Sequence, residues 1–251
     1  MQQVTLKILS NTPLTKDIYR MWLSAEGEES FAAIQQTVAG QFMNIAVSGC
    51  YLRRPISICD IDDNKICIVY KVIGKGTAAI SKMQRGESLD VLLPLGNGFD
   101  LTTAGSRPML VGGGVGVPPL LMLAKQLRLQ GKEVDTVLGF NTKEDIILAD
   151  EFRQAGCNVF ITTVDGTEGQ RGFVTDALKG IIQHTTYFYA CGPIPMLRAL
   201  NSTMTIPSQL SVEERMGCGF GLCMGCTCKT TAGAKQVCTD GPVFKTDEII
   251  L

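Results

Sequence analysis

Four cysteines near the end of the chain constrain it more than any other feature. Cys218, Cys223 and Cys226 lie within nine residues, and Cys238 follows after a further gap. The intervals of four, two and eleven residues match the plant-type pattern of [2Fe-2S] proteins. A structural zinc site is the competing interpretation, but such sites usually join two separated cysteine pairs. We therefore expect Cys218, Cys223, Cys226 and Cys238 to bind a [2Fe-2S] cluster.

A fifth cysteine, Cys228, lies two residues beyond Cys226. If this segment is extended, the side chain of Cys228 points away from its neighbour. We therefore expect Cys228 to be a neighbour of the cluster and not a ligand. The intervening glycines should let backbone N–H groups turn toward the cluster sulfurs.

The composition limits what the chain can do. Its 251 residues are 45% hydrophobic, which is enough to bury real cores. A formal net charge of −1 does not attract phosphate backbones, so we expect no nucleic acid partner. We see no signal peptide and no apolar run of transmembrane length, so we expect a cytoplasmic protein without a membrane contact. In a reducing compartment, ten cysteines favour metal binding over disulfides.

Short apolar segments predict an antiparallel β-barrel in the first hundred residues. The expected strands are 4–8, 18–23, 42–47, 55–59, 66–73 and 89–93. One helix, at 77–83, is expected to interrupt them. Because the turn-rich segment 94–100 ends this pattern, we place the barrel domain at 1–100.

After Arg107, predicted strands and helices alternate, which indicates a parallel sheet with crossover helices. The expected strands are 108–111, 134–140, 158–163 and 186–190, followed by a last strand at 209–213. The expected helices are 118–130, 147–155, 173–181 and one that begins after Pro193. We place an α/β nucleotide-binding domain at 101–210 and a small cluster domain at 211–251.

Two barrel segments together suggest one phosphate-binding site. In Arg53-Arg54-Pro55-Ile56-Ser57, an arginine can grip a pyrophosphate and the serine hydroxyl can meet a flavin ring nitrogen. Gly76 and Thr77 lead into the expected helix, whose first N–H groups are free to bind an anion. The alternatives are a solvated strand edge and an ordinary glycine turn.

Two turns suggest a dinucleotide site at the edge of the parallel sheet. Gly112, Gly113, Gly114 and Gly116 lie between a strand and a helix, where glycine lets the backbone contact a diphosphate. This is not the usual GxGxxG in its usual place, and a tight structural turn is the alternative. Cys191-Gly192-Pro193 ends another strand, where a thiol could lie beside a nicotinamide ring or simply fill a gap. The loop 163–172 follows a third strand and should lie on the same rim.

In this order, and over nearly the whole chain, these motifs resemble the ferredoxin reductase superfamily. A cluster segment after the nucleotide domain makes the chain similar to the electron-transfer subunits of NAD-dependent class 1B dihydroorotate dehydrogenases. Further points of likeness are Gly96-Asn97-Gly98-Phe99, Glu213-Glu214-Arg215-Met216-Gly217-Cys218 and Val237-Cys238-Thr239-Asp240-Gly241-Pro242-Val243-Phe244.

The resemblance implies three cofactors and their sites. FAD would be held in the barrel by Arg54, Pro55, Ile56, Ser57, Val69, Tyr70, Lys71, Gly76 and Thr77. NAD would be held by Gly112, Gly113, Gly114, Gly116, Cys191, Gly192 and Pro193. The four cysteines would ligate the cluster.

The resemblance also implies a partner and a direction of electron flow. Dihydroorotate would be oxidised on an FMN-containing catalytic subunit in pyrimidine biosynthesis, and electrons would pass through the cluster and FAD to NAD. Two chains of each kind would form a heterotetramer. The alternatives are a flavin and iron-sulfur subunit of a hydrogenase or ferredoxin:NAD(P) oxidoreductase, and a zinc-stabilised nucleotide-binding module without activity. The mixed charges of 141–145 leave the choice between NAD and NADP open.

Overall fold

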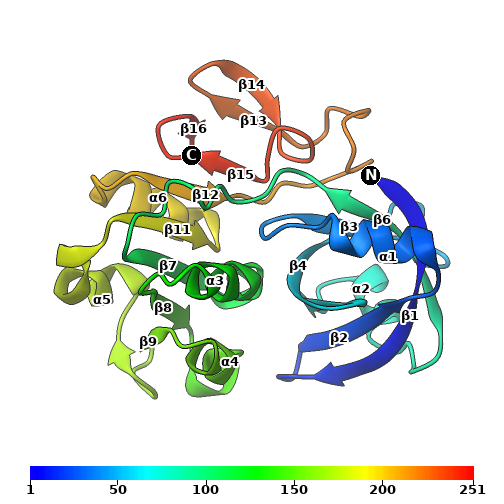
Figure 1. The fold of residues 1–251 in the computed structure, drawn as a ribbon, viewed down its shortest axis with the longest axis horizontal. Helices are drawn as coiled ribbons and strands as arrows, with labels where there is room; N and C mark the ends of the chain where they lie inside the picture. Colours follow the sequence, from blue (N-terminus) through cyan, green and yellow to red (C-terminus); the bar gives the residue numbers. More distant parts are fainter.

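The computed structural model describes residues 1–251 and begins with a closed six-stranded barrel (Figure 1). Its strands are β1 (Gln2–Pro13), β2 (Ile18–Ala25), β3 (Phe42–Ile45), β4 (Arg54–Asp62), β5 (Lys65–Lys71) and β6 (Ser88–Leu95). They pair in the order β1-β2-β5-β4-β3-β6, and each printed pairing is antiparallel. The predicted antiparallel barrel is confirmed.

Two helices, not one, interrupt the barrel strands. α2 (Lys75–Ile80) lies close to the predicted helix, but α1 (Glu28–Gln35) was not predicted. α1 is only eight residues long and buries just Ser30, Ala33 and Ile34. Such a short helix carries too few apolar positions to give a recognisable helical period.

A seven-stranded sheet follows the barrel. Its strands are β7 (Pro108–Gly113), β8 (Asp135–Phe140), β9 (Asn158–Thr163), β10 (Gln170–Arg171), β11 (Tyr187–Cys191), β12 (Ser208–Ser211) and β15 (Val243–Lys245). They are ordered β10-β9-β8-β7-β11-β12-β15, and all neighbours are parallel except β12 and β15. The crossover helices are α3 (Pro119–Leu129), α4 (Ala149–Gln154), α5 (Val174–Ile181) and α6 (Ile194–Thr203). The predicted parallel nucleotide-binding sheet is confirmed.

The C-terminal region leaves this sheet and returns to it. After β12 the chain forms the cysteine loop and the hairpin β13 (Thr227–Thr230) and β14 (Gly233–Gln236), then pairs back through β15. β16 (Ile249–Ile250) adds a third strand beside β13. The domain boundaries after residues 100 and 210 stay predictions. None of the helices has the length and apolar character needed to cross a membrane.

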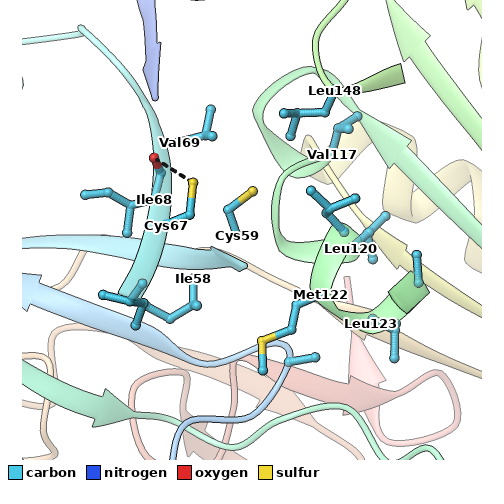
Figure 2. Close-up of a cluster of buried hydrophobic side chains, with 14 of the residues drawn as sticks. Ile58, Cys59, Cys67, Ile68, Val69, Val117, Leu120, Met122, Leu123 and Leu148 are labelled. Atoms are coloured by element: carbon cyan, nitrogen blue, oxygen red, sulfur yellow. Dashed lines mark hydrogen bonds between the residues drawn. The ribbon is translucent and has the colours of Figure 1, made fainter. Parts of the chain in front are cut away.

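One hydrophobic core joins the barrel to the nucleotide-binding sheet. It contains 43 buried residues, and α3 contributes a run of them that faces the barrel. Figure 2 shows Ile58 and Cys59 of β4 on one side and Leu120 and Met122 of α3 on the other. Because interiors pack at close to crystal density, this contact fixes the orientation of the two regions.

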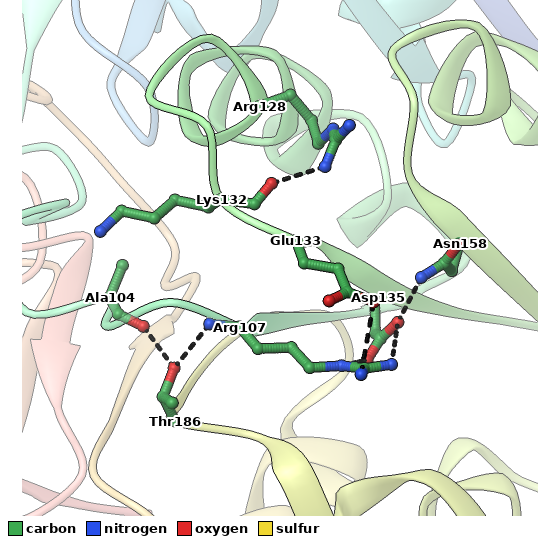
Figure 3. Close-up of polar contacts among 8 residues, drawn as sticks. All are labelled: Ala104, Arg107, Arg128, Lys132, Glu133, Asp135, Asn158 and Thr186. Atoms are coloured by element: carbon green, nitrogen blue, oxygen red, sulfur yellow. Dashed lines mark hydrogen bonds and ion pairs between the residues drawn. The ribbon is translucent and has the colours of Figure 1, made fainter.

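Polar contacts pin the opposite, amino-terminal edge of the sheet (Figure 3). The side chain of Asp135, 2% exposed, accepts hydrogen bonds from Arg107 Nε at 2.8 Å and Asn158 Nδ2 at 2.8 Å. The Thr186 hydroxyl donates to the Ala104 carbonyl at 2.7 Å. These contacts tie neighbouring strands together and leave the carboxyl ends free to form a site.

Two ion pairs reinforce the contact between barrel and sheet. Lys125 of α3 pairs with Asp60 of β4, whose side chain is only 7% exposed. Arg20 of β2 pairs with Glu151 of α4 at 2.7 Å. A buried carboxylate that loses its cation is left uncompensated in a medium of low polarity.

We expect Lys125→Met to lower the free energy of unfolding by about 2–4 kcal/mol, because it strands the Asp60 carboxylate. Adding Asp60→Asn should recover part of that loss. Denaturant unfolding of the purified chain measures both effects. The control is Arg153→Met, which breaks an exposed pair with Asp150 and should cost less than about 0.5 kcal/mol. If Lys125→Met and Arg153→Met lower the free energy of unfolding equally, the pair of Lys125 and Asp60 does not stabilise the contact between barrel and sheet.

Candidate functional site

A cavity of about 330 Å³ lies where β4, β5 and α2 meet. Every residue predicted to hold FAD lines it: Arg54, Pro55, Ile56, Ser57, Val69, Tyr70, Lys71, Gly76 and Thr77. The structure therefore brings two segments that are separate in sequence to one place. Their individual roles toward a flavin stay predictions.

Only one of the two neighbouring arginines is available to a ligand in this cavity. Arg53 makes a bidentate contact with the Asp90 carboxylate, at 2.9 and 3.0 Å. Arg54 instead lies against Gly76, where an added Cβ would come within 2.1 Å of its Nε. The Thr77 hydroxyl accepts the backbone N–H of Ile73 at 3.0 Å and so holds the turn before α2. Arg54 thus places a positive charge on the cavity wall, which suits the pyrophosphate of FAD.

A second cavity, of about 560 Å³, lies between the barrel and the carboxyl ends of the parallel strands. Of the residues predicted to hold NAD, it is lined by Gly113, Gly114, Gly116, Gly192 and Pro193. β7 and β11 are neighbours, yet the chain proceeds from β7 through β8 and β9 before it returns to β11. The cavity therefore lies at the point where the strand order reverses, which is where open α/β sheets bind their ligands.

Two predicted NAD residues lie outside the set that lines this cavity. Gly112 packs beneath Val117, whose Cγ2 would be 2.8 Å from an added Cβ. The Cys191 side chain is half-buried beside Ser211, and desolvation of the thiol raises its pKa to about 12 despite that contact. The backbone of Cys191 still shapes the site, because its carbonyl oxygen would be 2.3 Å from a Cβ on Gly116. Their contacts with NAD stay predictions.

Several lining residues were not predicted. They are Asp17 and Ile18 from the barrel, Gly139, Phe140, Asn141, Asp145, Thr162, Phe173, Val174 and Thr175 after the middle strands, and Pro195, Met196 and Ala199 from α6. The loop 163–172, which was expected on this rim, contributes Val164 and Gly172. The meeting of parallel strand ends at one edge could have indicated the middle group. The side chain of Phe173 is exposed and offers a flat apolar face to a base. Nothing in the sequence indicates that Asp17 of the barrel reaches a cavity at the edge of the parallel sheet.

The two cavities adjoin. Lys71 of β5 and Val115 of the glycine-rich turn line both of them. Lys71 also pairs with Asp17 at 3.2 Å, so this stretch of wall carries no net charge. A flavin in the first cavity and a nicotinamide in the second can therefore come into contact.

The cysteine loop directs backbone N–H groups at sulfur. Cys218 Sγ accepts from the N–H groups of Phe220, Leu222 and Cys223 at 3.2–3.5 Å. Cys223 Sγ accepts from those of Cys218 and Gly225 at 3.4 Å. Burial opposes ionisation of Cys218, but these bonds outweigh it and lower its pKa to about 6. The loop is thus built to stabilise negative charge on sulfur, as a cluster requires.

The four cysteines meet as two pairs. Cys218 interacts with Cys223 near the surface, and Cys226 interacts with Cys238 in the interior. Burial, together with the neighbouring Cys226, raises the pKa of Cys238 to about 12. No three His, Cys, Asp or Glu side chains converge as ligands of a single ion. Two sulfur pairs suit the two irons of a [2Fe-2S] cluster, whose ends each take two cysteines.

Cys228 lies apart from these pairs. It is on β13, opposite Lys235, and lines a separate small cavity with Arg198 and Val212. That Cys228 is a neighbour of the cluster and not a ligand stays a prediction.

Comparison with known proteins agrees with this arrangement. Residues 213–250 match the family described as the iron-sulfur cluster binding domain of dihydroorotate dehydrogenase B, and residues 110–202 match the oxidoreductase NAD-binding domain. The chain is 44% identical to the electron transfer subunit of dihydroorotate dehydrogenase B (NAD(+)) from Geobacillus sp. (strain WCH70), with 100% of both chains covered. It is also 44% identical to the corresponding subunit from Bacillus pumilus (strain SAFR-032), over 100% of this chain and 99% of that one.

Solved structures give the same architecture. An NADH-dependent reduced ferredoxin-NADP oxidoreductase is 29% identical with a TM-score of 0.88, over 98% of this chain and 89% of the other. Phthalate dioxygenase reductase is 20% identical with a TM-score of 0.69, over 91% of this chain and 87% of the other, and so shares the fold. The ferredoxin-reductase fold, the NAD-binding domain and the iron-sulfur cluster binding domain are thereby confirmed, and the zinc interpretation is not supported.

We expect Gly76→Ala to weaken FAD binding by about 10- to 100-fold, because the new methyl group displaces the Arg54 guanidinium from the cavity wall. The control is Gly180→Ala in α5, away from this cavity, where an added Cβ meets nothing within 4 Å. Flavin fluorescence during dialysis measures the retained FAD. If both variants lose FAD equally, Arg54 is not the group that Gly76 accommodates.

Proposed function

Because the chain belongs to the family of electron-transfer subunits of NAD-dependent dihydroorotate dehydrogenase B, we propose that it links an FMN-containing catalytic subunit to NAD. Electrons from dihydroorotate would reach this chain at its [2Fe-2S] cluster and leave it on NAD, with FAD between them. The observation that carries the proposal is the order of the three sites. Two adjoining cavities share Lys71 and Val115. The cysteine loop contacts β3, the strand beside β4, through the hydrogen bond from Asn44 to the Cys218 carbonyl.

The cofactors and the chain have separate tasks. When bound, FAD supplies the exchange between the electron pair of a nicotinamide and the single electrons of an iron-sulfur cluster. Arg54 would hold the pyrophosphate of FAD, while Val115 and Ile73 give the cavity apolar surface. Cys191 keeps its proton at neutral pH, because its pKa is about 12. It therefore does not act as a nucleophile, and it shapes the site through its backbone.

The cysteine loop supports a cluster through its backbone. Three N–H groups point at Cys218 Sγ, so this ligand is already inclined to be a thiolate. Cys238 is not, because burial holds its pKa at about 12. Cluster binding must therefore release a proton from the buried pair.

The partner subunit should contact the cysteine loop. Leu222 and Met224 are 79% and 63% exposed although both are large and apolar. Exposed apolar side chains beside a redox centre suit a protein contact. We propose that the FMN-containing subunit covers them, in an assembly of two chains of each kind. All ten cysteines are free, which supports a location in the reducing cytoplasm.

A second candidate is a subunit of a ferredoxin:NAD(P) oxidoreductase. The 29% identical structure of an NADH-dependent ferredoxin-NADP oxidoreductase supports it. The relatives at 44% identity over the whole chain favour dihydroorotate dehydrogenase B.

We expect anaerobic addition of NADH to the loaded chain to bleach the flavin absorbance and then to produce the EPR signal of a reduced [2Fe-2S] cluster. Mixed with the FMN-containing subunit, the chain should support NADH formation from dihydroorotate.

Leu222→Glu should weaken the complex with the FMN-containing subunit, measured by gel filtration, without changing the NADH titration. Flavin bleaching without an EPR signal would argue against the proposed route, and recovery only with a ferredoxin-dependent enzyme would favour the second candidate.

We expect Cys223→Ser to lose most of the bound iron and sulfide, because one of four ligands is replaced by a weaker one. Cys223 is exposed, so the fold should tolerate this change. Cys228→Ser is the control and should retain iron at the level of the unaltered chain. Iron analysis and visible absorbance give the result, and iron loss in the control would place Cys228 among the ligands.

A further inference from the structure

The short strand β3 has two different faces. The side chains of Met43 and Ile45 belong to the core shared with the nucleotide-binding sheet. Phe42 belongs to a second core together with Cys226 and Cys238. Asn44 is 1% exposed and alternates with Met43 and Ile45, so it points to the same side as Phe42. This face of β3 therefore meets the cysteine region.

Asn44 makes the polar contact across this boundary. Its Nδ2 donates to the backbone carbonyl of Cys218 at 2.8 Å, although the two residues are 174 positions apart. The contact depends on the next residue, Gly219, where an added Cβ would come within 2.5 Å of Nδ2. The buried Oδ1 of Asn44 has no hydrogen-bond partner in the chain. Burying this unpaired oxygen lowers the stability of the fold, a cost that an apolar side chain at the same position would not have.

The strand next to β3 lines the flavin cavity. In the antiparallel pair of β3 and β4, Asn44 lies opposite Pro55 and Phe42 lies opposite Ser57. Residues opposite each other in such a pair point to the same face of the sheet. Pro55 and Ser57 line the cavity predicted to hold FAD. Of the four β4 residues that line this cavity, Pro55 and Ser57 thus lie on the face that carries the contact to a cluster ligand on β3, and Arg54 and Ile56 lie on the other face.

We infer that Asn44 is a positioning residue for electron transfer, which rests on the function proposed above. Its hydrogen bond holds the Cys218 carbonyl against the strand that adjoins the flavin strand. The spacing between flavin and cluster is then set by the rigid barrel and not by the glycine-rich loop. Hydrogen-bond partners that orient the ligands of a metal centre tune its properties in the same way.

A second asparagine provides a matched control. Asn97 also joins the end of the barrel to the C-terminal region, through Nδ2 bonds to the carbonyls of Asp240 at 2.9 Å and Val243 at 3.0 Å. These carbonyls do not belong to predicted cluster ligands. Asn97→Asp therefore removes the same type of donor from a second contact between the barrel and the C-terminal region. That contact does not involve a predicted cluster ligand.

The test compares Asn44→Asp with Asn97→Asp in the chain loaded with FAD and cluster. A carboxylate has the shape of the amide but cannot donate to the carbonyl at neutral pH. We expect Asn44→Asp to slow cluster reduction by NADH about 10- to 100-fold and to alter the EPR line shape of the reduced cluster. The rate of flavin bleaching should be unchanged. Asn97→Asp should lower the melting temperature but leave the rate and the EPR line shape unaltered.

A second variant tests the same contact from the loop. Gly219→Ala, which crowds Asn44 at φ +81°, should reproduce the EPR change. Gly233→Ala at φ +108° is also strained, but its added Cβ meets open space. The inference is overturned if Asn44→Asp and Asn97→Asp reduce the cluster at the same rate with the same EPR spectrum. It is also overturned if Gly219→Ala matches Gly233→Ala. Failure of the unaltered chain to reduce its cluster would instead count against the proposed function.

Discussion

Apolar contact between the barrel and α3 is the interaction on which the rest of the molecule depends. Neither the flavin cavity nor the nucleotide cavity belongs to one region alone, since Lys71 comes from the barrel and Val115 from the sheet. The side chains of the hydrophobic core that runs between them are closely packed, so a small rotation would disturb many contacts at once. The buried carboxylate of Asp60 and its partner Lys125 add directionality that apolar packing lacks. The adjoining cavities therefore form only where the barrel and the parallel sheet pack together, and neither region would form them alone.

A second hydrophobic core fixes the position of the cysteine region against the barrel and the sheet. Phe42 and Leu95 from the barrel, Val111 from the parallel sheet, and Cys226 and Cys238 pack in one cluster of 19 buried residues. Three parts of the chain thus converge where the inner cysteine pair lies. The outer pair, Cys218 and Cys223, is held mainly by backbone N–H groups of its own loop. One end of the cluster is expected in apolar surroundings and the other near the surface.

Local patterns predicted the elements well, and distant contacts account for what was missed. Alternation of apolar residues indicated the barrel, and cysteine spacing indicated the cluster, because both signals lie within a few neighbouring residues. Cys191 was expected beside the nicotinamide, yet it is not among the residues that line the nucleotide cavity. Side chains at successive strand positions point in opposite directions, and a motif cannot show which one faces a ligand. Asp17, Phe173 and Asn44 acquire their surroundings only when regions far apart in sequence pack together. No pattern along the chain records that event.

The return of β15 to the sheet has a consequence for how electrons can move. Because Leu210 of β12 lies opposite Phe244 of β15, the segment that carries the cysteines leaves and re-enters the sheet at neighbouring strands. It is an insertion clamped at both ends, unlike a carrier module tethered by a single flexible linker. Such a module must diffuse between donor and acceptor, and its search sets the rate. Here no search is needed inside the subunit, because the cysteine segment is anchored to the sheet on both sides.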